Sequence, residues 1–448
     1  MLTKELSRRK FLAASAVAVI GTALSACAPT PAPAEVAGED PVVPEPALKE
    51  AVTIRFAGRT GVQGDHFVER ARAFEEEYPE IKVEVELAPG EEYHQKMEIQ
   101  FAGGTQADTF WTVLLAGLYH RYATKGELLP LDDYIAAHGY DLDVFYPETI
   151  DASRIDGTIY GLAWICHPGR VGNFYNVTML EDEGMEPPPT DGDWDFVDLV
   201  EKAKALTKDT TGDGRIDQFG FRPGTDLWSV FVWYRSCGAE FFNEDGTQCV
   251  MDSDEGMQAV QYLHDLYHVH KVAPTPEQII DMMFETGKVG MYQAGYWGAS
   301  ARDRIGDRFE MSSTPLPKGP AGVMGSMYEF DPNCIYRQSR HPEESFEFLK
   351  WMANQETGIR IAEVGSVPGA RPDVWEHPRL TQDPMHVVMA DIMSEVMPFR
   401  GPGNYRGLEV QDAITQGLTP IWLGDASPEE VVPDVATEVQ RILDQPPL

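Results

Sequence analysis

Alternating strand-like and helix-like segments constrain the fold of this chain more than any other sequence feature. Apolar and polar residues alternate in VTIRFA and again in IKVEVEL, a pattern typical of strands with one face in a core. Helix-like stretches separate these two strands from each other and from a third, more apolar one. The predicted order is strand 52–57, helix 67–78, strand 81–87, helix 93–101 and strand 108–113. This order predicts an α/β fold with a parallel sheet covered by helices.

Two side chains fall where such a sheet places its ligand sites. Ligands of open α/β sheets bind beyond the carboxyl ends of the strands. Arg59 follows the first predicted strand, and Trp111 lies near the end of the third. Both residues are therefore candidates for a binding site, and core packing is the alternative role for Trp111.

A second set of strands and helices follows the first, without an internal repeat. The length of 448 residues is enough for two or three domains. Strands are predicted at 159–162, 171–175, 309–311 and 324–330, and helices at 196–206, 227–236, 254–269, 276–286, 342–363 and, with breaks, 384–423.

The N-terminus carries the features of an export signal. Arg8 and Arg9 precede an uncharged run at 11–26, which is too short to cross about 30 Å of hydrocarbon as a helix. A positive start, a short apolar centre and a small-residue exit predict a signal peptide at 1–26. The paired arginines indicate the Tat route, which carries folded proteins.

Cys27 follows this segment directly, in the sequence LSAC. The exit resembles the lipobox of bacterial lipoproteins, in which the cysteine is acylated. A plain signal peptide with a chance cysteine is the alternative. Residues 27–50 are rich in proline and are predicted as an extended tether. The protein is therefore expected to be extracytoplasmic, lipid-anchored to the membrane on its periplasmic or cell-surface side.

The charge balance excludes nucleic acid as a partner. The chain has 36 basic and 72 acidic residues and a formal net charge of −36. Such a surface repels a phosphate backbone. Apolar residues make up 43% of the chain, a content that supports packed cores rather than disorder.

Four cysteines follow Cys27, and they allow three pairings among which the sequence does not choose. Cys237 and Cys249 flank an apparent hairpin. A disulfide between them and buried free thiols are both open alternatives. The other two cysteines are Cys166 and Cys334.

Several segments, in order along the chain, resemble the extracellular solute-binding proteins of bacterial ABC sugar transporters (family 1, maltose-binding-protein-like). The resemblance covers nearly the whole chain beyond the tether. The strongest match is GKVGM at 287–291 followed by GYW at 295–297. The others are AFEEEYPEIKV at 73–83, YHQKM at 93–97, FAGGTQAD at 101–108, DGTIYGL at 156–162, FYN at 174–176, PLP at 315–317 and GSVPGAR at 365–371.

The resemblance implies a two-lobed periplasmic-binding-protein fold of type II, with lobes joined by crossing hinge strands. The N-terminal lobe would hold 51–164 and 328–366, and the C-terminal lobe 165–327 and 367–448. Such a protein captures a mono- or oligosaccharide in the cleft between the lobes, and hinge closure buries the ligand. It then delivers the ligand to the membrane permease subunits of an ABC importer. A monomer without enzymatic activity is expected.

The resemblance also suggests which residues line the cleft. Sugars need aromatic rings for their apolar faces and charged or amide groups for their hydroxyls. Some relatives carry a hydroxyl-binding carboxylate where this chain has His167 and Arg170, and this difference puts a maltose-like specificity in doubt. A structural role is the alternative for His167. The predicted ligand-binding set is Arg59, Trp111, Trp164, His167, Arg170, Trp228, Tyr296, Trp297, Glu329 and Tyr405.

The segment DTTGDGRID resembles the first nine positions of a calcium-binding loop. The twelfth position is Gly220, where such a loop places a bidentate glutamate. An acidic turn with Asx-type hydrogen bonds is the alternative, and no other cofactor is expected. The predicted calcium ligands are Asp209, Thr211, Asp213, Asp217 and the backbone carbonyl of Arg215.

Two other functions remain as alternatives. Arg59, His167 and Arg170 would suit a sugar acid or a glycerol-phosphate-type ligand. A secreted glycoside hydrolase needs two carboxylates about 5–9.5 Å apart, one with a raised pKa. No GxSxG or HExxH sequence supports hydrolysis.

Overall fold

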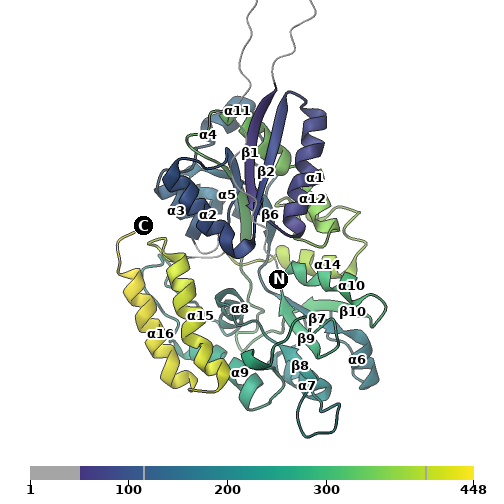
Figure 1. Ribbon diagram of the computed structural model, residues 1–448. Helices are drawn as coiled ribbons and strands as arrows, with labels where there is room; N and C mark the ends of the chain where they lie inside the picture. Colours follow the sequence, from purple (N-terminus) through teal and green to yellow (C-terminus); the bar gives the residue numbers. More distant parts are fainter. Residues whose placement is uncertain (1–50, 115–116, 399–400, 448) are drawn as a thin grey trace, which may run out of the picture. The chain divides into compact units, whose positions relative to one another are not determined.

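Five strands drawn from distant parts of the sequence form the first sheet (Figure 1). Their order is β2 (Ile81–Ala88), β1 (Val52–Arg59), β3 (Thr109–Trp111), β11 (Glu329–Ile335) and β6 (Gly161–His167). β1 runs parallel to β2 and β3, and β11 is antiparallel to β3 and β6. The carboxyl ends of β1, β3 and β6 therefore lie beside the beginning of β11. We call this end of the strands the edge of the first sheet.

The computed structural model describes residues 51–114, 117–398 and 401–447. The predicted signal peptide, the predicted acylation site Cys27 and the predicted tether lie outside these ranges. Within them, no helix combines the length and the apolar character that crossing a bilayer requires.

Helices pack on the first sheet through aromatic side chains. Phe56 of β1 lies 4.7 Å from Phe67 and 5.6 Å from Phe348, measured between ring centroids. All three rings are fully buried, and burying such a side chain stabilises a fold by roughly 1.5–3 kcal/mol. The helices here are α1 (Val62–Glu77), α2 (Gly90–Gly103), α3 (Leu118–Thr124), α4 (Asp132–His138), α5 (Pro147–Ser153), α11 (Pro342–Met352) and α12 (Gln355–Glu363).

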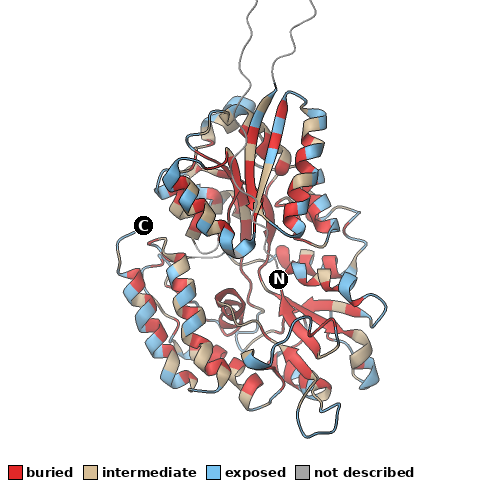
Figure 2. Ribbon diagram, in the orientation of Figure 1, coloured by how far each residue is buried: buried red, intermediate tan, exposed pale blue. Residues whose placement is uncertain are grey.

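The second sheet has four strands, in the order β10 (Met311–Pro315), β7 (Gly172–Asn176), β9 (Val289–Ala294) and β8 (Phe219–Arg222). β8 and β9 are parallel, so Arg222 and Ala294 end at the same edge. β7 is antiparallel to both of its neighbours. Figure 2 shows that the strands of both sheets are mainly buried except for β2 at the side of the first sheet, whereas most helices are buried on one side.

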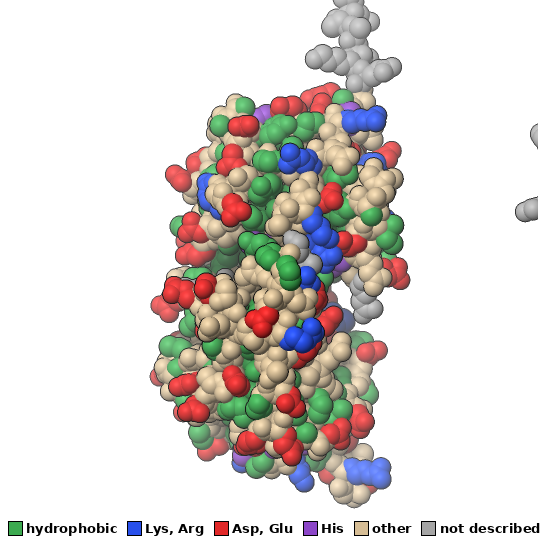
Figure 3. Space-filling view, turned by 90° about the vertical axis from the view of Figure 1, so that its left-hand side faces the viewer, with side chains coloured by type: hydrophobic (Ala, Val, Ile, Leu, Met, Phe, Trp, Pro, Cys, Tyr) green, Lys and Arg blue, Asp and Glu red, His purple; other side chains and the backbone are tan. Residues whose placement is uncertain are grey.

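Most of the remaining elements complete this second body. α8 (Leu227–Ser236) is buried along its whole length. The other helices are α6 (Val177–Asp182), α7 (Phe196–Leu206), α9 (Asp254–His268), α10 (Ala301–Ile305), α14 (Pro384–Met393), α15 (Gly407–Leu423) and α16 (Pro428–Leu443), with 3-10 turns η2 (Pro276–Gln278) and η3 (Tyr296–Ser300). The short helix α13 (Pro372–Trp375) contacts α12, and the short strands β4 (Arg154–Ile155) and β5 (Thr158–Ile159) pair with each other beside α5. Acidic side chains are spread over the face seen in Figure 3.

The element predictions were correct for many helices and strands, but β8, β9 and the short helices α3, α4, α5 and α6 were not predicted. The helices predicted at 196–206 and 227–236 have these bounds in the structure. The helix predicted at 276–286 is wrong, because only η2 forms and Met282 adopts a left-handed φ of 57°. α16 was not predicted, and the strand predicted at 324–330 begins only at Glu329.

Candidate functional site

At the edge of the first sheet, charged residues surround a buried tryptophan. The guanidinium of Arg59 lies over the Trp111 ring, 4.5 Å from its centroid. The indole Nε1 of Trp111 donates a hydrogen bond to Asp331 Oδ2 at 3.0 Å. Arg59 also donates from Nε to Gln63 Oε1. Trp111 is 2% exposed, and its buried ring contacts both Arg59 and Asp331.

His167 and Glu329 form the neighbouring part of this edge. The two residues are paired in register between β6 and β11, and His167 Nε2 lies 3.5 Å from Glu329 Oε2. The backbone N–H of Gly169 donates to His167 Nδ1 at 3.2 Å. The neutral imidazole therefore carries its proton on Nε2, facing the carboxylate.

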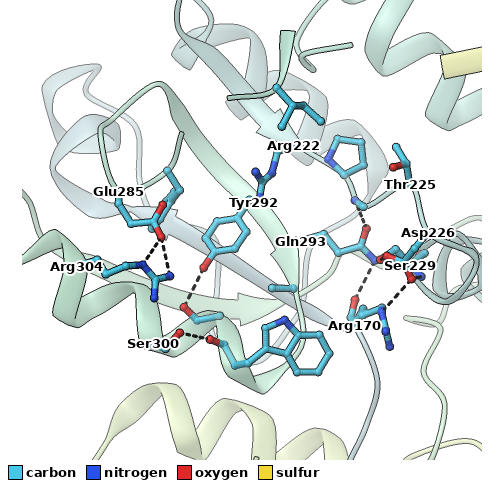
Figure 4. Close-up of a pocket in the computed structure, with 17 residues that line it drawn as sticks. Arg170, Arg222, Thr225, Asp226, Ser229, Glu285, Tyr292, Gln293, Ser300 and Arg304 are labelled. Carbon is cyan, nitrogen blue, oxygen red and sulfur yellow. Dashed lines mark hydrogen bonds and ion pairs between the residues drawn. The ribbon is translucent and has the colours of Figure 1, made fainter. Parts of the chain in front are cut away.

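Arg170 connects this edge to the edge of the second sheet. Its Nη1 donates to Glu329 Oε1 at 3.0 Å, and its Nε lies 3.1 Å from Asp226 Oδ1. Its guanidinium is 5.3 Å from the centroid of Trp297. Asp226 also accepts hydrogen bonds from the backbone N–H groups of Trp228 and Ser229, and so caps α8. Figure 4 shows the contact between Arg170 and Asp226.

A cavity of about 400 Å³ opens at this edge of the second sheet. This volume lies in the range of small-molecule sites. It combines strand ends, the first turn of α8 and the turn η3. The lining residues used below are Arg170, Arg222, Asp226, Tyr292, Trp297 and Arg304.

Trp297 presents its ring to this cavity. It is 37% exposed, and it is the only tryptophan among the described residues that is exposed rather than buried or half-buried. Gly295 makes this position of the ring available, since a Cβ there would lie 2.3 Å from a ring carbon of Trp297. The edge of the ring also faces His167, with centroids 5.4 Å apart.

Two other predicted residues, Trp228 and Tyr405, line a second cavity of about 380 Å³. Trp228 donates from Nε1 to Gln411 Oε1 at 3.2 Å. The ring of Tyr405 stacks on His120 at 5.2 Å, and its φ of 60° lies in the left-handed region. These residues therefore line a different cavity from Trp297.

Trp164 and Tyr296 lie in the core. Trp164 is 1% exposed and packs on Phe67 at 4.5 Å. Tyr296 is 6% exposed, and its hydroxyl is bound to His386 Nδ1 at 2.8 Å. Neither ring lines a cavity described above, and packing accounts for both positions.

Burial controls the protonation of this site. It raises the pKa of Glu329 to about 7, an effect that Arg170 opposes. It raises the pKa of Asp331 to about 6, against the influence of Arg59. Burial and the neighbouring arginines Arg170 and Arg59 lower the pKa of His167 to about 3. The site at neutral pH therefore holds a neutral histidine and a glutamate close to its titration point.

The predicted calcium loop uses its oxygens internally. Asp209 accepts hydrogen bonds from the backbone N–H groups of Gly212, Asp213 and Gly214. The Lys288 ammonium lies 2.9 Å from Asp217 Oδ2, where it would repel a calcium ion. Within the described ranges, no group of three or more His, Cys, Asp or Glu side chains could hold a metal ion. This arrangement fits the Asx-turn alternative, and the calcium site stays a prediction.

The cysteines of the described ranges are unpaired. Cys166, Cys237 and Cys334 are buried, and Cys249 is half-buried. Of the two alternatives, the structure therefore has free thiols.

Sequence reasoning missed several residues of the site. Asp226, Asp331, Arg222 and Gln293 were not predicted. Gln293 accepts from the Trp233 indole and donates to the Arg170 carbonyl. A strand prediction at 219–222, which the sequence analysis did not make, would have placed Arg222 at the end of a strand.

Comparison with known proteins identifies the class. Residues 60–359 match the family of bacterial extracellular solute-binding proteins, and the chain belongs to this family. An arabinooligosaccharide-binding protein of Halalkalibacterium halodurans is 23% identical over 348 residues, which cover 75% of each chain.

Two solved structures are similar to the whole two-sheet body. A substrate-binding protein of Listeria monocytogenes, in complex with cycloalternan, has a TM-score of 0.78 at 22% identity and covers 88% of this chain and 99% of its own. The GacH receptor of Streptomyces glaucescens, solved unliganded and with acarbose, has a TM-score of 0.77 at 21% identity, with 89% and 100% covered. The chain therefore has the two-lobed α/β fold, and each sheet forms the centre of one lobe.

Proposed function

We propose that this protein captures a carbohydrate between the edges of its two sheets and delivers it to an ABC importer. The observation that carries the proposal is the exposed Trp297 ring, held by Gly295 and flanked by Arg170 and Asp226. An aromatic plane beside charged hydrogen-bonding groups suits a sugar, whose faces are apolar and whose rim is polar. The saccharide ligands of the relatives support the same ligand class.

Isothermal titration calorimetry with a panel of mono- and oligosaccharides tests this proposal. We expect at least one saccharide to bind, and Trp297→Ala to weaken its binding tenfold or more, about 1.4 kcal/mol. Ile99→Ala is the matched control, because Ile99 is 73% exposed and lines no cavity described above. Equal affinity of wild type and Trp297→Ala would place the ligand elsewhere.

The same incubations test for enzymatic activity. We expect chromatography to recover every saccharide unchanged, since reversible capture breaks no bond. Hydrolysis products that increase with time would overturn the proposal of a binding protein.

We further propose that Cys27 is acylated and holds the exported protein, as a monomer, near its transporter. A tether raises the effective concentration of a captor at the membrane. We expect wild type in the membrane fraction and Cys27→Ala in the soluble extracytoplasmic fraction. The same distribution for both proteins would contradict the anchor. Delivery predicts that purified importer hydrolyses ATP faster when the loaded protein is added.

A further inference from the structure

The cavity beside Trp297 contains a cation that no acidic side chain neutralises. Arg222 is the last residue of β8 and is half-buried. Its guanidinium lies 5.5 Å from the centroid of Tyr292. Among the residues that the structure describes, none forms a hydrogen bond or an ion pair with this guanidinium. Figure 4 shows Arg222 beside Tyr292, between Arg304 and Arg170.

The other two arginines of the cavity are neutralised within the protein. Arg304 Nη2 lies 2.6 Å from Glu285 Oε1, and Arg170 is shared between Glu329 and Asp226. The cavity thus has three arginines against two acidic lining residues, although the whole chain has twice as many acidic as basic residues. The positive charge that remains belongs to Arg222.

Tyr292 holds this charge in place. The Tyr292 hydroxyl donates to the Gly298 carbonyl at 2.9 Å, so that its ring is fixed beneath the guanidinium. A cation over an aromatic face is stabilised there while its N–H donors stay free. Arginine is also the side chain best suited to a planar, two-point contact with a carboxylate or phosphate.

From these contacts we infer that Arg222 binds an anionic substituent of the ligand, a carboxylate or a phosphate ester. The inference rests on the proposed carbohydrate function and specifies its substrate class. Trp297 and Arg222 line the same cavity, so a sugar ring on Trp297 can direct an acidic group towards Arg222. Partially desolvated ion pairs of this kind discriminate strongly, because a neutral analogue leaves the cation without its partner.

Calorimetry with matched ligands tests the inference. For each of several hexoses we would compare the neutral sugar, its uronate and its 6-phosphate at constant ionic strength. We expect one anionic form to bind at least tenfold more tightly than its neutral counterpart, and the form that does so identifies carboxylate or phosphate. In Arg222→Gln this preference should disappear, and in Arg222→Lys it should be reduced.

Arg215→Gln is the control, because Arg215 is an exposed arginine outside the cavity. Melting temperatures report whether Arg222→Gln folds, and we expect only a small decrease, because the contact with the Tyr292 ring is lost but no hydrogen bond or ion pair is. If neutral sugars bind as tightly as their anionic forms, or if Arg222→Gln keeps the preference, this inference is wrong and the proposed function stands. If no sugar of either kind binds, the proposed function fails and the inference fails with it.

Discussion

Arg170 and Glu329 are joined by two hydrogen bonds, of 3.0 and 3.3 Å, although they are 159 positions apart in the sequence. Glu329 begins β11 of the first sheet, whereas Arg170 lies between the last strand residue of β6 and the first of β7. Asp226, at the start of α8, contacts the same guanidinium. One arginine therefore connects the two halves of the candidate site.

Removing Arg170 should destabilise the protein in a pH-dependent way. Arg170→Ala leaves the buried Glu329 carboxylate without its cation, and breaking such a pair costs about 3 kcal/mol. Protonation relieves this cost, so we expect a larger loss at pH 8 than at pH 6, measured by urea unfolding. Arg441→Ala breaks the exposed Arg441–Glu438 pair and should leave stability unchanged. If both variants lost the same unfolding free energy, the Arg170–Glu329 pair would be no more stabilising than an exposed ion pair.

Glu329 should make stability fall as pH rises. Its folded-state pKa of about 7 lies above the ordinary 4.5, so the folded state binds the proton more tightly. Between pH 4.5 and 7 this contribution decreases with pH, by roughly 3 kcal/mol at most. His167 acts in the opposite direction between about pH 3 and 6.5, because its pKa is lowered.

The difference in unfolding free energy between wild type and Glu329→Gln isolates the glutamate. We expect wild type to lose stability relative to the variant from pH 5 to 7.5, and the difference to be constant above pH 8. A difference that does not depend on pH would mean that Glu329 titrates normally.

Gly295→Ala should impair binding without unfolding the protein. The new Cβ would lie 2.3–2.8 Å from the Trp297 ring, which must then move. Because that ring is partly exposed, we expect the move to cost ligand affinity tenfold or more and to change the melting temperature little. Gly90→Ala is the control, since a Cβ there meets nothing within 4 Å. Unchanged affinity in Gly295→Ala would contradict the role of the ring.

Calcium should not stabilise this chain. Lys288 occupies the position beside Asp217 that a cation would take, and Asp209 is bound to backbone amides. We therefore expect the same melting temperature in EDTA and in millimolar calcium. A rise with calcium that Asp209→Asn abolishes would confirm the sequence-based prediction of a calcium site.

Local patterns determined most of the fold. The capping aspartates Asp195 and Asp226 mark where α7 and α8 begin, and both starts were predicted correctly. β11 was misplaced because Pro332 argues against a strand. The structure accommodates this proline at a register shift between Asp331 and Pro332. α16 was missed because it contains Pro433.

The site was less predictable, because it depends on contacts distant in sequence. Nothing local shows that Glu329 pairs with His167, and that pairing places both beside Arg170. Aromatic character alone did not separate Trp297, which faces a cavity, from Trp164, which lies in the core. The difference follows from tertiary packing, in particular from Gly295 beside the Trp297 ring.

Hydrogen–deuterium exchange with the best-binding saccharide tests the central claim most directly, that one ligand bridges both sheet edges. We predict slower exchange at 165–170 and 329–331 of the first sheet and at 222–229 and 294–298 of the second. The loop 209–217 should not change. Protection confined to one sheet, or located away from these edges, would contradict the account.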